Sequence, residues 1–556
     1  MGLGILDTHP GIEVLPGTVV LAEKEAHSEE LTKFLKHGKG RYAHIVLSPQ
    51  PSDDPNDPLN WPMIKKWALV ATLALGAATV AGTIGPLLNA SLFLVANEFD
   101  RPIGDIAIVA GYQLLVAASS APFISVISRK FGKRPVFLLA SFLPLTGTIV
   151  GSASNTYTSL LTARIVQGFG AAAYESLIFS VHGDLFFVHE RGYYNTIQTF
   201  VLNCSSILAS VVTGPISDSL GWRYLFHILI AVLGLQLLLV FFLVPETTYH
   251  RPANDLVQEV LAVTTEGTFS DKNESIEKEV HFATLSNAVE QSTAATPTNV
   301  PAIKTYIQSL AIYTGVHSNE SWLSLFVGPF IACTNIGALW SIVVSGGLTS
   351  FFVGVSFLPA QLFSIPPYNL TTAGVGYTSI GPFIGGTLGC AFLGLLIDPL
   401  AVFLSRRNCG VYEPEFRLPL GLLGLISAAG FFAFGYTAQY QMDIYLICFV
   451  WGVALFGVCI TVGVSITYAL DAYRTMSNEI FLANIMFKNF LFYGYTYFVN
   501  QWTAKNGPRD LLYTFAGVNV AMVLTVVPMY VWGKRSRAFW HKHNIFEKLG
   551  VQTHEE

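Results

Sequence analysis

The stretch LTARIVQGFGAAAYESL, residues 161–177, is mostly apolar but holds two charges of opposite sign, Arg164 and Glu175. A helix of about 20 such residues crosses a bilayer core. The two charges are 11 positions apart, so they share one helix face, with Gly168 and Ala171 between them. A charge that faces lipid costs at least ~2.5 kcal/mol. We therefore expect both side chains to point into the protein, along a stripe that lines a water-filled cavity.

The composition of the whole chain favours a membrane protein. Of its 556 residues, 52% are hydrophobic and 12% are charged, and the mean hydropathy is +0.50. Soluble domains carry about 25% charged residues, so this chain has too little polar surface to coat a soluble globule. The net charge of −5 and the lack of basic clusters argue against a nucleic-acid partner. The six cysteines show no CxxC spacing, which favours apolar packing over metal binding or disulfides.

Hydropathy divides the chain into two sets of apolar runs, each long enough to span a bilayer. The expected runs are 66–88, 105–127, 135–153, 157–180, 195–215, 221–244, 331–357, 372–397, 417–437, 443–469, 476–500 and 511–533. The predicted fold is an all-α membrane protein with twelve transmembrane helices in two six-helix bundles. Its expected parts are a cytosolic N-terminal segment (1–65), a first bundle (66–245), a central cytosolic loop (246–330), a second bundle (331–533) and a cytosolic tail (534–556).

Short-loop charges predict the orientation, because basic residues accumulate on the cytosolic side. With the N-terminus inside, nine basic residues are cytosolic and four are outside. The cytosolic ones are Arg129, Lys130, Lys133, Arg134, Arg191, Arg406, Arg407, Arg417 and Arg474. Both termini are then cytosolic, and the sequon Asn369-Leu370-Thr371 lies outside, where Asn369 is a glycosylation candidate. We expect a plasma-membrane protein, with the vacuolar membrane as the alternative.

Two motifs, one in a loop and one in a helix, carry a family resemblance. Residues 128–135, SRKFGKRP, resemble the basic loop motif G-x-x-x-D-R-x-G-R-R of the major facilitator superfamily. Gly132, Lys133 and Arg134 match, but Arg129 stands at the acidic position. The resemblance implies a charge network that latches the cytosolic side, and that latch must differ here. The sequence Arg164-Ile165-Val166-Gln167-Gly168-Phe169-Gly170 is similar to the family motif R-x-x-Q-G-x-G, whose arginine is assigned to proton coupling.

Further motifs resemble particular branches of that superfamily. Gly214-Pro215 is similar to the antiporter motif G-P-x-x-G-G, although Asp218 and Ser219 replace its last glycines. Three stretches resemble the fungal branch of twelve-span drug:proton antiporters. They are Asp57–Pro62, Arg406–Leu418 and Asp471–Arg474. The resemblance implies proton-coupled export of small organic molecules by a monomer without a cofactor.

Arginine stays protonated at physiological pH, so Arg164 can only tune a carboxylate that carries the proton. Burial raises a carboxyl pKa and a nearby cation lowers it, which makes Glu175 our candidate carrier. A structural ion pair is the alternative for each residue. Lys488 lies near mid-membrane and needs a carboxylate, a carbonyl or an anionic ligand. The predicted substrate cavity is formed by Gln167, Gly168, Ala171, Asn484, Lys488 and Tyr495. The predicted gating residues are Gly132, Lys133, Arg134, Gly214, Pro215, Asp398, Arg406 and Asp471.

Two other functions stay open at this point. The first is proton-coupled uptake of a nutrient or organic cation by the same fold, which the altered Gly214-Pro215 motif permits. The second is a membrane sensor that binds without transporting, although such proteins tend to have long signalling tails. The sequence has no G-x-x-x-x-G-K-[ST] motif, so ATP-driven pumping by this chain is not expected. The sequence shows no pair of catalytic residues at a membrane face, so nothing in it indicates an enzyme.

Overall fold

The computed structural model describes residues 19–20, 51–52, 54–249, 303–318, 321–408, 411–473 and 476–543. The first half contains η3 (Pro58–Asn60), α2 (Met63–Gly76), η4 (Ala77–Thr83), η5 (Gly85–Leu88), α3 (Leu92–Glu98), α4 (Ile103–Phe131), α5 (Lys133–Ser152), α6 (Tyr157–Leu185), α7 (Val188–Leu220) and α8 (Arg223–Leu243). The second half contains α11 (Tyr306–Ser309), α12 (Trp322–Ala332), α13 (Ile336–Val355), α14 (Leu358–Phe363), α15 (Thr372–Tyr377), α16 (Ile380–Arg407), η6 (Pro414–Gly424), α17 (Leu425–Gln439), α18 (Ile444–Ala472), α19 (Ser477–Asn506), α20 (Pro508–Leu524) and α21 (Val526–Lys542). Two short strands, β1 (Val19–Val20) and β2 (Val411–Tyr412), pair antiparallel.

The predicted all-α membrane fold is confirmed. Within the described residues, ten helical segments are long and apolar enough to cross a bilayer. Two further helices, α6 and α19, have 29 and 30 residues but contain more polar side chains. Ten segments together with these two are consistent with the predicted twelve spans. These two helices carry the predicted proton-coupling and substrate-cavity residues.

Several helix ends differ from the predicted domain boundaries. α12 begins at Trp322, within the region expected to be the central loop (246–330), and ends at Ala332. α21 continues from the last span to Lys542, into the expected tail. Most of the central loop, residues 250–302, lies outside the described residues, as does Arg474.

The first span is broken by a proline. α2 runs into the π-helical turn η4 and then into the 3₁₀ turn η5, which contains Pro86. Proline has no N–H to donate and clashes with the preceding turn, so it kinks or breaks a helix. The carbonyl of Ile84, at this break, accepts a hydrogen bond from Arg164 at 2.6 Å. The break therefore supplies an acceptor to a side chain of α6.

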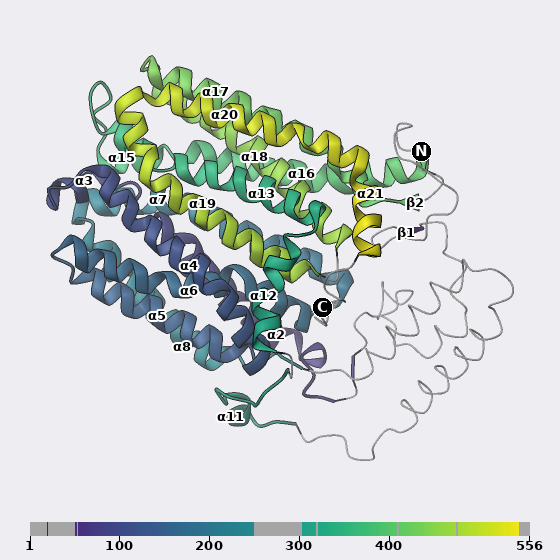
Figure 1. Cartoon of the computed structure of the whole chain (residues 1–556). Helices are drawn as coiled ribbons and strands as arrows, with labels where there is room; N and C mark the ends of the chain where they lie inside the picture. The colour runs from purple at the N-terminus through teal and green to yellow at the C-terminus, as the bar shows by residue number, and fades with distance from the viewer. Residues whose placement is uncertain are drawn as a thin grey trace, which may run out of the picture.

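The two halves meet along α4 and α19, which Figure 1 shows side by side through the middle of the molecule. In the first half, α6 packs against α4 and α5, and α5 packs against α8. In the second half, α13 packs against α18 and α19, and α17 packs against α18 and α20. α7 of the first half contacts α15 and α16 of the second. The seam between the halves is therefore built mainly from α4, α6 and α7 on one side and α15, α16 and α19 on the other.

Glycines bring α16 and α18 into backbone contact. A Cβ atom placed on Gly385 would lie 2.0 Å from the carbonyl oxygen of Gly452. Similar clashes would occur at Gly381 with Cys448 and at Gly389 with Phe456. The spacing of four residues predicts this close approach, because it places the three glycines on one helix face.

Candidate functional site

A cavity lies between the two halves. Its volume is about 120 Å³, and it is open on one side. Residues of η5, α4, α6 and α7 line it from the first half, and residues of α13, α16, α18 and α19 line it from the second. Its polar lining residues include Asn89, Glu175, Ser206, Ser210, Thr349, Ser350, Ser356, Ser379, Lys488 and Asn489. Its aromatic lining residues are Phe352, Phe357, Phe492 and Trp451. Such a mixture of apolar walls and a few polar groups is typical of a small-molecule site.

Glu175 and Lys488 are the two charged residues in this lining. They form an ion pair, with 3.1 Å between Lys488 Nζ and Glu175 Oε2. The Glu175 side chain is 9% exposed and that of Lys488 is 22% exposed. Because α6 and α19 belong to different halves, this pair joins the halves inside the cavity. The carboxylate that the buried ammonium needs is thus the predicted proton carrier itself.

Apart from the ion-paired Glu175 carboxylate, three buried polar groups that line the cavity have no hydrogen-bond partner among the described residues. These are the donors Asn489 Nδ2 and Trp451 Nε1 and the acceptor Asn89 Oδ1. The side-chain amide of Asn89 also donates to Ser356 Oγ at 3.0 Å, which links the two halves a second time. A buried polar group without a partner costs about 1–3 kcal/mol. A ligand with both donors and acceptors would satisfy these groups.

Arg164 is fully buried and does not line this cavity. It donates to the carbonyl of Ile84 and lies 3.4 Å from Gln113 Oε1 and 3.3 Å from Gln167 Oε1. Its Nε and Nη2 atoms have no partner, and no carboxylate within the described residues pairs with it. The structural ion pair considered for Arg164 is therefore absent from the described residues. Neutral oxygens of α4, α6 and the broken first span hold the guanidinium instead.

The expected stripe between Arg164 and Glu175 is packed against another helix. A Cβ atom on Gly168 would lie 2.3 Å from the carbonyl oxygen of Gln113 in α4, and Ala171 is buried. Gln167 donates to Thr148 of α5 at 2.8 Å. The cavity lining thus differs from the predicted stripe, because the small residues serve close helix packing.

Two more predicted cavity residues lie elsewhere in the second half. Asn484 accepts a hydrogen bond from Ser345 at 3.0 Å and lines a separate, smaller pocket between α13, α18 and α19. Tyr495 packs its ring against Phe351 and Phe515. Of the six predicted cavity residues, Lys488 is the one that lines the cavity between the halves. Whether the other five affect substrate binding stays a prediction.

The connection between α4 and α5 is held by a carboxylate. Gly132 has a φ of 92°, which favours glycine. Glu246 accepts from the backbone N–H groups of Lys133 at 2.9 Å and Arg134 at 3.0 Å, at the start of α5. A negative charge is stabilised at a helix N-terminus. The Lys133 ammonium pairs with Asp184 at 2.8 Å. The matched motif residues are thus tied to the ends of α6 and α8.

The acid missing from the loop motif is supplied by the other half. Arg129, which stands at the acidic position, pairs with Glu479 at the start of α19, at 2.7 Å. Nearby, the rings of Phe179 and Phe481 stack at 5.5 Å between α6 and α19. The two halves therefore contact each other at this end through an aromatic stack and an ion pair in which the motif position carries the positive charge.

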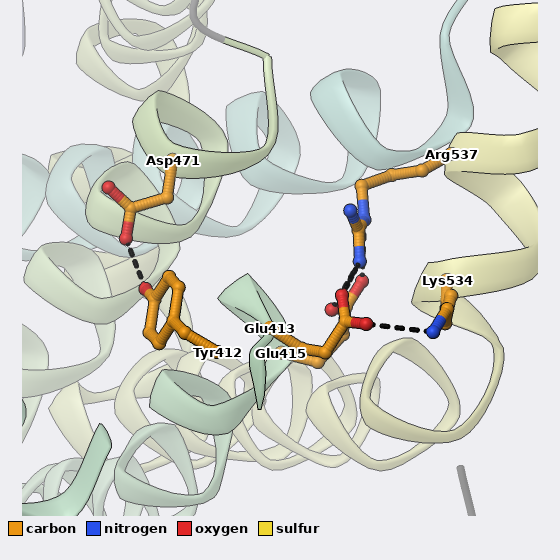
Figure 2. Close-up of polar contacts among 6 residues, drawn as sticks. All are labelled: Tyr412, Glu413, Glu415, Asp471, Lys534 and Arg537. Carbon is orange, nitrogen blue, oxygen red and sulfur yellow. Dashed lines mark hydrogen bonds and ion pairs between the residues drawn. The ribbon is translucent and has the colours of Figure 1, made fainter. Parts of the chain in front are cut away.

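The second half has its own charge network at the same end. Arg417 pairs with Asp398 at 3.3 Å and with Asp471 at 2.9 Å. Tyr412 donates to Asp471 at 2.5 Å, as Figure 2 shows. Burial, and then the charge of Asp471, raise the pKa of Tyr412, so its hydroxyl remains a donor. Arg406 is exposed.

A second cluster in Figure 2 joins the start of η6 to α21. Arg537 is 2% exposed and pairs with Glu413 at 2.7 Å and Glu415 at 2.8 Å. Lys534 pairs with Glu413 at 2.7 Å. The sequence analysis did not identify this cluster. A Glu-x-Glu stretch before one span and basic residues at the end of another are the only signal, and they do not show that the groups are buried together.

The remaining predicted residues lie near the opposite ends of these helices. A Cβ atom on Gly214 would lie 2.8 Å from the carbonyl oxygen of Thr372 and 3.1 Å from the Cα of Gly376, so α7 and α15 are in backbone contact there. The adjacent Pro215 lies inside α7. Asn369 is exposed in the connection between α14 and α15.

Two helical bundles around a shared cavity define a membrane transporter architecture. The Major Facilitator Superfamily model matches residues 68–490. The chain belongs to the Major Facilitator Superfamily, whose members are transporters that bind small molecules within the membrane. The family resemblance seen in the sequence is thereby confirmed.

The chain is similar to several fungal transporters. An uncharacterized MFS-type transporter of Schizosaccharomyces pombe is 27% identical, covering 98% of this chain and 96% of the relative. Protein HOL1 of Saccharomyces cerevisiae is 22% identical, covering 98% and 99%. The cercosporin MFS transporter CTB4 of Cercospora nicotianae is 22% identical, covering 87% of each.

Two solved structures share the fold. The xylose transporter XylE from E. coli, in a partially occluded inward-open conformation, gives a TM-score of 0.52 at 16% identity, covering 82% of this chain and 96% of that one. The peptide transporter POT in complex with sulfate gives a TM-score of 0.54 at 13% identity, covering 86% and 95%. At these identities the likeness concerns the fold alone.

Proposed function

We propose that this chain is a proton-coupled exporter of small organic molecules that works by alternating access. The observation that carries the proposal is the Glu175–Lys488 pair, which joins the halves inside the cavity. Protonation of Glu175 removes its charge and with it the attraction to Lys488. The pair is partly shielded from water, so its loss changes the contact between the halves more than loss of an exposed pair would.

In this mechanism, proton uptake and substrate binding act on the same two groups. A substrate that enters the cavity meets the Glu175–Lys488 pair and the unpartnered groups of Asn89, Asn489 and Trp451. A ligand shifts a conformational equilibrium only by binding one state more tightly than the other. Substrate groups that compete for Glu175 or Lys488 provide that difference. Arg164 is held by neutral oxygens. In this mechanism it acts through the electrostatic field of its positive charge and by holding α4 and α6 in position.

The nature of the substrate follows from the cavity and from the relatives. Aromatic walls and several hydroxyl groups suit a small organic molecule of mixed polarity. One fungal relative is named as a cercosporin transporter, which supports transport of a small organic molecule. Proton-coupled uptake is the second candidate, and the departure at Asp218 and Ser219 from the antiporter motif favours it. We place the protein in the plasma membrane as a monomer, with both termini in the cytosol.

The test uses Glu175→Gln in proteoliposomes that contain the full-length protein and a panel of small organic compounds. Counterflow, which needs substrate binding and alternating access but no net proton movement, should be retained. Proton-driven accumulation should be lost, and the remaining exchange should no longer depend on pH. Asp510→Asn is the matched control, because Asp510 is exposed in the first turn of α20 and pairs with its neighbour Arg509.

The direction of proton-driven flux in the same vesicles separates export from uptake. Accumulation by Glu175→Gln equal to that of the wild type would refute the role of Glu175. If Glu175→Gln instead lowered protein level and counterflow together, with an unchanged pH dependence, the pair would be structural. Lys488→Gln should weaken substrate binding and shift the pH dependence, since it removes the partner of Glu175.

A further inference from the structure

Residues 303–318 and 321–323, called the strap here, expose many large apolar side chains although they lie outside the membrane-spanning segments. Ile307 is 81% exposed, Leu323 is 70% exposed and Trp322 is 51% exposed. The other exposed apolar side chains of the strap are Ile303, Tyr306, Ile312, Tyr313 and Val316. A contiguous exposed apolar surface of this kind marks a site that contacts a partner or a membrane.

Hydrogen bonds fix the strap to the ends of the spans. The Tyr306 hydroxyl donates to the carbonyl of Phe242 in α8 at 2.8 Å. Arg134 of α5 donates to the carbonyl of Leu310 at 3.1 Å. The backbone N–H of His317 donates to the carbonyl of Lys130 in α4 at 2.8 Å. The strap thus runs across the end of the first bundle that carries the α4–α5 connection.

The strap is bonded to the end of α8 that exposes apolar side chains. α8 is a membrane-spanning helix, and Phe241, Phe242 and Leu243 in its last turn are exposed. Tyr306 is bonded to this same turn, and Figure 1 shows α11 beyond the end of α8. At its other end the strap leads into the apolar helix α12, which packs against α4 and α19. Both ends of the strap are therefore at the level where the bundle leaves the bilayer.

The side chains of the strap suit the boundary between lipid headgroups and acyl chains. Trp and Tyr are enriched there, because they combine an apolar ring with a polar group. Trp322 lies under the ammonium of Lys130 at 5.2 Å, and its ring is near Phe131, the last residue of α4. The sequence from 303 to 323 contains one lysine, one glutamate and one histidine, so it has no basic cluster that would select anionic lipids.

We propose that the strap lies in the headgroup–acyl boundary of the leaflet next to the α4–α5 connection, and that lipid is its partner. Apolar burial holds it there, so its membrane contact is independent of anionic lipid. Because it is bonded to the ends of α4, α5 and α8 and continues into α12, the lipid contact anchors the start of the second bundle relative to the first. This inference does not depend on the transported substrate or on proton coupling.

The test places an environment-sensitive fluorophore on the full-length protein in lipid nanodiscs. Ile307→Cys carries the label in the strap, and Lys505→Cys, at the exposed end of α19, is the control. The wild-type protein gives the background from the native cysteines, five of which are partly buried. Quenching is measured with nitroxide at a shallow acyl position and with aqueous iodide. The Ile307→Cys label should emit at shorter wavelength than the control, with at least two-fold stronger lipid quenching and weaker iodide quenching.

Replacing part of the lipid by an anionic lipid should change the quenching less than two-fold. A label at Ile307→Cys that is quenched by iodide as strongly as the control would overturn the proposal, since the strap would then face water. A label shielded from both quenchers would overturn it as well, because protein would cover the strap. The substitution Ile312→Asp with the label at Ile307→Cys should reduce lipid quenching, and unchanged quenching would show that apolar burial does not hold the strap.

Discussion

Replacing Arg537 by alanine leaves Glu413 and Glu415 buried without their main counter-charge. The guanidinium makes hydrogen bonds of 2.7, 2.8 and 2.9 Å to the two carboxylates, and its side chain is 2% exposed. Removing one partner from a buried ion pair costs about 3–5 kcal/mol, because the remaining charge stays buried. We therefore expect Arg537→Ala to lower the thermal midpoint of the purified full-length protein strongly.

Lys534 gives the matched control for this prediction. Its ammonium pairs with Glu413 at 2.7 Å, but its side chain is 21% exposed, so the pair is partly solvated. Loss of such a pair costs about 0.2–1 kcal/mol. Lys534→Ala should lower the midpoint several times less than Arg537→Ala, and Arg537→Lys should fall between them because it keeps the charge without the planar fork. Tryptophan fluorescence on heating measures all three, and equal shifts for Arg537→Ala and Lys534→Ala would refute the reasoning.

Three further predictions concern the bundle, the loop and the site. Gly385→Ala should sharply reduce the yield of folded protein on size-exclusion chromatography, since its Cβ would lie 2.0 Å from the carbonyl oxygen of Gly452. Gly394→Ala is the control and should be tolerated, because a Cβ there would have no atom within 4 Å. Equal yields for the two variants would contradict the contact. Asn369→Gln should remove a glycan-dependent shift in gel mobility, and a tag at this loop that reacts only in permeabilised cells would exclude the proposed orientation. Arg164→Ala should abolish proton-driven transport at normal membrane level, with poor rescue by Arg164→Lys, while normal transport would show that the residue serves packing alone.

The spans and the family are readable from the sequence because they depend on local composition and short motifs. Runs of about 20 apolar residues define membrane helices, and the glycine spacing at Gly381, Gly385 and Gly389 predicts a close helix contact. These signals are contained within one helix, so no knowledge of the neighbouring helices is needed.

The cavity is less predictable, because its lining depends on how helices from the two halves rotate against each other. Helix periodicity places Gly168 and Ala171 between Arg164 and Glu175, but it does not show that α4 covers this stripe. The acceptor for Arg164 is a backbone carbonyl at a proline-dependent break, 80 residues earlier in the chain. The partner of Lys488 lies in the other half. Charge alone indicates that Lys488 needs a carboxylate, and only the packing identifies Glu175.

If Glu175 carries the proton as proposed, the Glu175–Lys488 pair also sets how the membrane voltage acts on the cavity. As an ion pair it has no net charge, so the voltage exerts no net force on these two groups when the empty protein changes conformation. Protonation of Glu175 leaves the single positive charge of Lys488. A voltage of 100 mV acts on one charge with about 2.3 kcal/mol if that charge crosses the whole field. Under that proposal, the voltage would drive the conformational change of the protonated form more strongly than that of the unprotonated form, and an anionic substrate group beside Lys488 would cancel the difference.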